Sequence, residues 1–263
     1  MHLHVSNTQR VLQLTLCRPE KRNALDAEMC GSIVEAVRDA QDRDEVGSIL
    51  IAAHGPVFCS GMDLDEAVGP KAEELERVHE ALFTLGSESL KPLVVCANGA
   101  ALGGGVGLVA QGHVVVAAEN AVFALTEIRV GLWPFLVYRS VEAALGPRRT
   151  LELSLTGRTF HAHQGLHWGL VHQVCPLPEV SDRARAVARE LAKSSPLAIA
   201  HGMQYVRDSR GKSLEDAGKL AASLRGELMN SDDFREGVAA FKQKREALWP
   251  SMKVQAGNGN SAR

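Results

Sequence analysis

The chain has 263 residues, of which 45% are hydrophobic and 23% charged, which is typical of one compact domain or of a domain with a small appendage. The balance of 29 basic against 31 acidic residues, a formal net charge of -2, argues against a nucleic-acid binder, so any anionic ligand must be met by a local cluster of charge. The N-terminus has no basic start followed by an apolar segment, and no run approaches the roughly 20 apolar residues of a membrane span, so we expect a cytoplasmic protein that binds no membrane.

Up to about residue 148 the chain alternates strand-like and helix-like patterns, which favours an α/β fold. Residues 26–42 are predicted to form a helix with Asp26 as N-cap, and Met29, Ile33 and Val37 recur at spacing four on one buried face. The first predicted strand alternates as a half-exposed strand does, the next two are short apolar runs, and the last two form a second pair. The predicted strands are 11–16, 48–53, 92–97, 113–118 and 121–125.

The C-terminal part is dominated by four amphipathic helical segments, each of which starts with Ser, Asp or Pro. They cover residues 178–194, 196–209, 213–230 and 231–249. Their apolar faces need a partner, either the core or another subunit. We therefore divide the chain into a β/α core (1–195), a C-terminal helical region (196–250) and a disordered tail (251–263).

Five glycines lie between Gly99 and Gly107, directly after the predicted strand 92–97. Each glycine within an element costs about 1 kcal/mol relative to alanine, so the cluster serves either close packing or a loop whose backbone N–H groups reach a ligand. The segment does not match G-x-G-x-x-G, because Leu108 stands where the last glycine belongs. A helix can begin at Gly104 or Gly105, and its first N–H groups would suit an oxyanion.

A second turn of small residues, 55–67, follows the predicted strand 48–53 and precedes an acidic, helix-like segment. No G-x-S-x-G nucleophile elbow is present around Ser60. Two neighbouring strands would then each end in a turn that offers N–H groups, and these donors could converge on one carbonyl oxygen.

Other patterns that suggest a ligand site are weaker. RGKS at 210–213 imitates the end of a phosphate-binding loop, but Val206 stands where its first glycine belongs. His163 and His167 could share a helix face as metal ligands, yet no glutamate or cysteine accompanies them, so exposed or capping histidines are the better interpretation. The five cysteines are scattered and form no C-x-x-C pair, which indicates reduced thiols rather than disulfides or a zinc site.

Four segments have the residues, order and spacing typical of one family. They are CRPEKRNALD, FCSGMDLDE, ANGAALGGGVGL and FALTEIRVGL. In these segments the chain resembles the enoyl-CoA hydratase/isomerase, or crotonase, superfamily, and the likeness extends from about residue 11 to 245. The resemblance implies a core of β-β-α turns that form a superhelix, with helical C-terminal elements that assemble trimers and often hexamers. It also implies an acyl-CoA thioester as substrate and no separate cofactor.

The resemblance places an oxyanion hole at the backbone N–H groups of Met62 and Gly104. A thioester carbonyl gains negative charge as its enolate forms, and two preorganised donors there are worth several kcal/mol. Asp63 is also expected to cap the following helix. For Phe241 and Lys244, which would reach the nucleotide from a neighbouring subunit, a solvated amphipathic helix is an equal alternative. The implied substrate-binding residues are Arg22, Ala24, Ser60, Gly61, Asp63, Leu64, Trp133, Phe241 and Lys244.

Family hydratases usually present two glutamates. The second corresponds to Glu127, but the first position falls on Gly107. We therefore weigh three hypotheses: a hydratase-like lyase that acts through Glu127, a double-bond isomerase in which Glu127 alone moves a proton, and a CoA-thioester binder with little turnover. Apolar neighbours such as Leu132 and Phe135 predict a raised pKa for Glu127.

Two further residues bear on the acyl pocket. His79 lies in a segment that covers the pocket by resemblance, although a histidine on a helix face with no role there is the favoured interpretation. Phe135 stands where dienoyl-CoA isomerases place an aspartate, which argues against that subclass.

Overall fold

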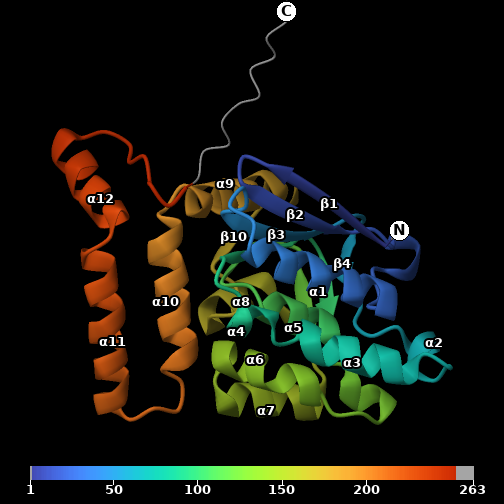
Figure 1. Cartoon of the computed structure of the whole chain (residues 1–263). Coiled ribbons are helices and arrows are strands. Elements are labelled where there is room, and N and C mark those ends of the chain that lie inside the picture. Colours follow the sequence, from blue (N-terminus) through green and yellow to red (C-terminus); the bar gives the residue numbers. More distant parts are fainter. Residues whose placement is uncertain (1, 253–263) are drawn as a thin grey trace, which may run out of the picture.

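A six-stranded sheet forms the first layer of the fold in the computed structural model, which describes residues 2–252 (Figure 1). All neighbouring strands are parallel except β1 and β2, which form an antiparallel pair. The predicted strands 11–16, 48–53, 92–97 and 113–118 are confirmed, whereas the sequence pattern does not predict β1. In spatial order the strands are β1 (Leu3–Thr8), β2 (Val11–Leu16), β3 (Ser48–Ala53), β5 (Leu93–Ala97), β7 (Val114–Ala118) and β10 (Gln173–Cys175).

The second sheet has four short strands: β4 (Val57–Cys59), β6 (Ala100–Leu102), β8 (Val122–Ala124) and β9 (Phe160–His161). The predicted strand 121–125 is confirmed as β8, but the expectation that it pairs with the strand 113–118 is wrong. Both edges of β7 are occupied by β5 and β10, so β8 pairs instead with β6 and β9 in the second sheet.

The chain passes repeatedly from the first sheet to the second and then into a helix. The pairs β3–β4, β5–β6 and β7–β8 each contribute one strand to each sheet. Because β4, β6 and β8 are neighbours, the segments that follow them are brought to one edge. These segments lead into α2 (Leu64–Ala67) and α3 (Ala72–Leu82), α5 (Gly104–Ala110), and the 3-10 helix η2 (Glu127–Val130) with α6 (Phe135–Leu145).

Helices cover both faces of the six-stranded sheet. On one face, α1 (Ala27–Gln41) begins as predicted, with the Asp26 carboxylate accepting from the Met29 N–H at 2.8 Å and Ile33 and Val37 in the core. On the other face, α9 (Leu177–Ala192) packs a stripe of small residues against the strands. The strand β2 is largely buried rather than half-exposed, and its Val11 packs in the cluster that α9 forms with the sheet.

The remaining helices of the core are short. They are η1 (Pro19–Lys21), α4 (Leu85–Glu88), α7 (Pro147–Thr156) and α8 (Ala162–Trp168). The histidines His163 and His167 lie in α8. In residues 2–252, no three His, Cys, Asp or Glu side chains are grouped so as to hold a metal ion. All five cysteines are free thiols.

The last three helices, α10 (Pro196–Asp208), α11 (Leu214–Met229) and α12 (Asp232–Gln243), stand beside the sheets rather than over them (Figure 1). Each begins at a serine whose side chain accepts a backbone N–H, namely Ser195, Ser213 and Ser231. The helix predicted to reach 249 ends at Gln243, because Lys244 turns to φ 55°. Over residues 2–252 no helix combines the length and apolar character needed to cross a membrane. The predicted disorder of the tail concerns residues that, from 253 on, lie outside the described part of the chain.

Candidate active site

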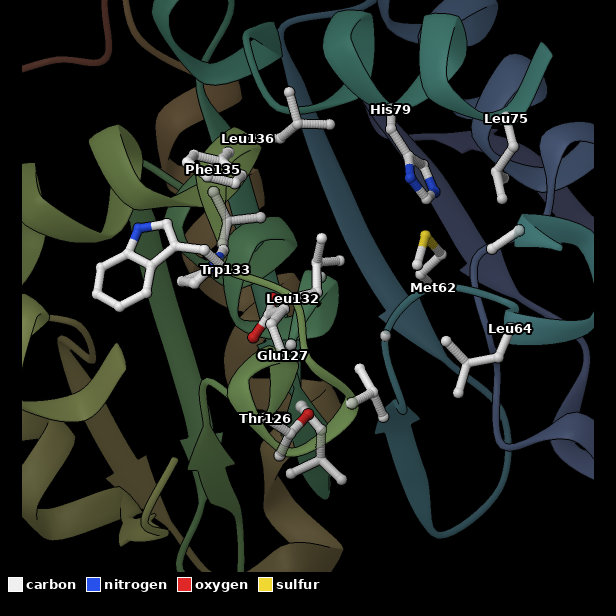
Figure 2. Close-up of a pocket in the computed structure, with 18 of the residues that line it drawn as sticks. Met62, Leu64, Leu75, His79, Thr126, Glu127, Leu132, Trp133, Phe135 and Leu136 are labelled. Carbon is white, nitrogen blue, oxygen red and sulfur yellow. The ribbon is translucent and has the colours of Figure 1, made fainter. Parts of the chain in front are cut away.

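A cavity of about 630 Å³ opens between α3, η2, the start of α6 and the two glycine-containing turns (Figure 2). Its wall is mainly apolar and includes Met62, Leu75, Leu132, Trp133 and Leu136. Of the predicted binding residues, Ser60, Gly61, Leu64 and Trp133 line it, together with the three predicted catalytic residues Met62, Gly104 and Glu127.

The Met62 turn is held by backbone pairing with the segment before α1. The Leu25 N–H donates to the Gly61 carbonyl at 2.8 Å, and the Asp63 N–H donates to the Leu25 carbonyl at 3.0 Å. Gly61 has φ +98°, and a Cβ there would lie 2.9 Å from the Leu102 carbonyl oxygen, so this position requires glycine. The intervening Met62 N–H takes no part in this pairing.

The second turn leads from β6 into α5. Gly103 has φ 50° and ψ -120°, a conformation open only to glycine, and its N–H donates to the Ala124 carbonyl at 2.8 Å. The first helical bonds run from Val106 and Gly107 to the Gly103 carbonyl, so the Gly104 N–H precedes them. The predicted start of a helix at Gly104 is confirmed.

The two turns bring the Met62 and Gly104 nitrogens to one place in the cavity wall. A Cβ built on Gly104 would lie 3.7 Å from the Met62 nitrogen, and one built on Gly61 would lie 3.4 Å from the Gly104 nitrogen. Backbone donors that converge in this way are suited to an oxygen that gains negative charge during a reaction.

Glu127 begins η2 and lies in the cavity wall (Figure 2). Its Oε1 is 3.3 Å from the position that a Cβ on Gly103 would take, so the carboxylate is next to the α5 turn. Its Oε2 is buried and has no hydrogen-bond partner in the described part of the chain. Burial raises the pKa of Glu127, as predicted, and a hydrogen bond from its own backbone N–H only partly opposes this.

The position expected for a second carboxylate is filled by other side chains. A Cβ on Gly107 would overlap Val137 Cγ1 and would lie 2.8 Å from Val137 Cβ and 2.9 Å from Phe83 Cε1. Gly107 is thus a packing position between α5 and α6, and Glu127 is the carboxylate next to the paired N–H groups. The sequence does not reveal the contact of Gly107 with Val137 and Phe83, because no local pattern shows what a glycine packs against.

Arg18 ties together the segments on either side of the Met62 turn, and the sequence analysis missed it. Its buried guanidinium contacts the Asp26 carboxylate at 2.9 Å, the Asp63 carboxylate at 3.1 Å and the Ala24 carbonyl at 2.8 Å. Both aspartates are helix N-caps, of α1 and α2. In the sequence, the only sign of this role for Arg18 is that a basic residue precedes the predicted cap Asp26.

Asp63 has a structural position rather than one in the cavity wall. Its carboxylate accepts from the N–H groups of Asp65 and Glu66, which confirms the predicted cap, and from Arg18. Burial alone would raise the pKa of Asp63, but these hydrogen bonds outweigh it and lower the pKa below its usual value. The Asp63 side chain thus holds the turn, and its expected contact with substrate stays a prediction.

Arg22 and Ala24 lie in the loop that pairs with the Met62 turn, and both of their carbonyls already accept internal hydrogen bonds, from the Ser60 N–H and from Arg18. Phe241 is 85% exposed on α12, and Lys244 follows it. Figure 1 places α12 on the far side of the molecule from α2 and α3, so one chain does not bring Phe241 and Lys244 to the cavity.

His79 lies on a buried face of α3 and also lines the cavity, so its place beside the acyl pocket agrees with the resemblance while a role there stays a prediction. It is buried on α3, and its ring is 5.6 Å from that of Phe83, one helical turn further on. Burial lowers the pKa of His79 to about 4, although a backbone hydrogen bond with Leu25 opposes the shift.

Two converging N–H donors and a buried carboxylate in an apolar cavity are the features of an acyl-transfer or enolate-forming site on an α/β fold. The family model described as enoyl-CoA hydratase/isomerase matches residues 6–252. The chain therefore belongs to the enoyl-CoA hydratase/isomerase (crotonase) superfamily of acyl-CoA enzymes, and the resemblance seen in the sequence is confirmed.

Individual relatives agree with this assignment. The chain is 33% identical over 256 residues to carnitinyl-CoA dehydratase of Salmonella paratyphi A, covering 94% of this chain and 97% of that protein. The structure of enoyl-CoA hydratase from Mycobacterium smegmatis matches with a TM-score of 0.89 at 27% identity, over 95% of this chain and 99% of the other. Human enoyl-CoA hydratase domain-containing protein 3 gives a TM-score of 0.90 at 26% identity, with 95% and 100% covered. The predicted crotonase fold with C-terminal helices is confirmed, and in this structure its strands form two mixed sheets.

Proposed function

We propose that the chain adds water to the double bond of a 2-enoyl-CoA thioester, or removes it in reverse, with Glu127 as the sole acid and base. The observation that carries this proposal is the buried Glu127 carboxylate, whose Oε2 has no hydrogen-bond partner within residues 2–252, beside the turns that hold the Met62 and Gly104 nitrogens. The relationship to a protein named carnitinyl-CoA dehydratase supports a lyase.

In the proposed reaction the thioester carbonyl oxygen accepts hydrogen bonds from the Met62 and Gly104 N–H groups. Glu127 removes a proton from water as the water oxygen bonds to C3, and the electron pair of the C2–C3 double bond moves to form the enolate. The protonated Glu127 then returns its proton to C2, which restores the carboxylate. A raised pKa suits this double task, because a group that both takes and gives a proton works best with a pKa near the working pH.

Coenzyme A would lie along residues 20–25, with its pantetheine arm passing Ser60 and Leu64 at the cavity mouth. Lys21 and Arg22 supply local positive charge for the nucleotide, although Lys21 is also paired with Asp65 at 3.0 Å. CoA is part of the substrate, so this chemistry requires no separate cofactor.

The filled space at Gly107 favours a second candidate, a double-bond isomerase. A lone carboxylate could remove a proton from C2 of a 3-enoyl thioester and return it to C4 of the dienolate held by the same two N–H groups. A mere CoA-thioester binder is the weakest alternative, because it would not require the carboxylate that the cavity holds.

A panel of 2-enoyl and 3-enoyl thioesters tests these candidates. Hydration of a 2-enoyl thioester adds the mass of one water, and isomerisation of a 3-enoyl thioester creates conjugation without a change in mass. The first outcome alone supports the lyase and the second alone the isomerase. Turnover of neither class, with retained binding of acetyl-CoA, would leave only the binder.

We also propose that α10–α12 mediate assembly into a trimer or into a hexamer built from trimers. Apolar residues on these helices remain exposed in the single chain, including Val206, Phe234, Val238 and Phe241. Phe241 and Lys244 would then reach the nucleotide of a neighbouring subunit. Sedimentation at micromolar concentration checks this, and a stable monomer would contradict it.

A further inference from the structure

His79 presents an unused hydrogen-bonding atom to the cavity. His79 is only 4% exposed, and Figure 2 shows its ring projecting from α3 toward Met62. Its Nε2 is buried and has no hydrogen-bond partner within residues 2–252. Of the cavity-lining residues described, His79 and Glu127 are the two with such an atom.

The unpaired Nε2 is an acceptor when the neutral ring carries its proton on Nδ1. Burial lowers the pKa of His79 to about 4, so the ring is neutral at ordinary pH and one of its two nitrogens is free to accept a hydrogen bond. A buried acceptor without a donor costs about 1–3 kcal/mol, which a ligand with a suitable donor would relieve.

The surroundings define that donor. Leu75 lies one turn before His79 on α3, Phe83 is the C-cap residue one turn after it, and Met62 lies opposite. A charged donor would be poorly solvated among these side chains. A water molecule needs two to four polar partners, and the side chains of these three neighbours offer none. A neutral hydroxyl borne on an otherwise apolar chain satisfies both conditions.

The donor also belongs to a part of the ligand other than the reacting atoms. Figure 2 shows His79 beside Met62 and Glu127 on the other side of the cavity, near Leu132, so the two polar atoms face different parts of the cavity. We propose that His79 Nε2 accepts a hydrogen bond from a hydroxyl group on the acyl chain of the substrate, beyond the C2 and C3 atoms on which Glu127 acts. This inference rests on the proposed function.

Binding of saturated thioesters, which have no double bond to hydrate or to move, tests the inference separately from turnover. Hexanoyl-CoA is compared with its 4-, 5- and 6-hydroxy derivatives by calorimetric titration. At least one hydroxylated thioester should bind the wild type about tenfold more tightly, since the correct hydroxyl pairs a buried acceptor that hexanoyl-CoA leaves unpaired. His79→Phe should abolish this preference, and His79→Gln, whose Oε1 is an acceptor, should retain part of it.

Leu75→Met is the matched control, because it changes the same wall one turn away and should keep the preference. If His79→Phe unfolds, His79→Leu removes the acceptor with a smaller side chain. Equal binding of all four thioesters by the wild type, or a preference that survives loss of the imidazole, would overturn the inference. Failure of the proposed function has a different signature, namely no turnover of any enoyl thioester while the hydroxyl preference in binding persists.

Discussion

Val137 Cγ1 occupies the space in which a side chain at residue 107 would begin. The two residues belong to α6 and α5, which pack directly against each other, and Phe83, the C-cap of α3, fills the same space from another side. Packed side chains therefore fill the space that a second glutamate at this position would need. A glutamate introduced at 107 would have to displace Val137 and Phe83, so that substitution alone does not create a two-carboxylate site.

Gly107→Ala should destabilise the protein by about 1–3 kcal/mol, because its methyl group overpacks the α5–α6 contact. Val137→Ala opens space at the same point, so the double variant should lose less stability than the sum of the two single variants. Urea unfolding of the four proteins measures this coupling. Strictly additive losses would show that the two positions do not compete for space.

Arg18→Met should cost about 3–5 kcal/mol of stability, because it leaves the buried Asp26 and Asp63 carboxylates without their shared cation. Lys21→Met is the control from the same loop, since the exposed Lys21–Asp65 pair should contribute little. Urea unfolding compares the two. Equal small losses would mean that Arg18 does not hold the Met62 turn.

The parts of the fold that sequence reasoning predicted depend on local patterns. Helix α1 follows from the Asp26 cap and the stripe through Ile33 and Val37, and β3 and β5 follow from short apolar runs ahead of turns. Strand β1 has only Leu3 and Val5 between polar residues, and it is held by pairing with β2. The separation of β7 and β8 into two sheets depends on β5 and β10, which no local window contains.

The site likewise contains residues that local motifs predict and residues whose contacts come from distant parts of the chain. The family motifs placed Met62, Gly104 and Glu127 at positions that the structure brings to one cavity. Arg18 and Asp63 are 45 residues apart, and Gly107 meets Val137 from another helix, so neither contact leaves a trace in a short stretch of sequence. His79 looked like an ordinary helix residue because its pattern shows a buried face but not the cavity beneath it.

Gly104→Ala should lower kcat at least about tenfold, since its methyl group would lie 3.7 Å from the Met62 nitrogen, where the thioester oxygen is proposed to bind. The methyl would also press on Leu25 Cδ1 and Phe83 Cζ, at 3.2 and 3.3 Å. Gly31→Ala in α1 is the matched control, because nothing lies within 4 Å of its new methyl group, and it should keep full activity. Steady-state kinetics on the best thioester of the panel decide this, and full activity in Gly104→Ala would contradict the proposed oxyanion hole.

Glu127→Gln should reduce kcat at least about a hundredfold and leave the affinity for an unreactive acyl-CoA nearly unchanged, because it keeps the shape of the side chain and removes the base. The base acts when ionised, so kcat/KM of the wild type should fall as the pH drops through a pKa above 4.5, the ordinary glutamate value from which burial shifts it.

The same shift predicts the pH dependence of stability. Between 4.5 and the raised pKa the folded protein binds more protons at Glu127 than the unfolded chain, so this residue's contribution to stability declines as the pH rises through that window. Glu127→Gln removes the buried charge and should therefore be more stable than the wild type above the window, with no such advantage below pH 4.5. Urea unfolding at several pH values measures the difference. A stability advantage of Glu127→Gln that is the same at every pH would show that Glu127 is not desolvated. In the kinetic experiment, full activity of the same variant would rule out Glu127 as the proton carrier in both the lyase and the isomerase.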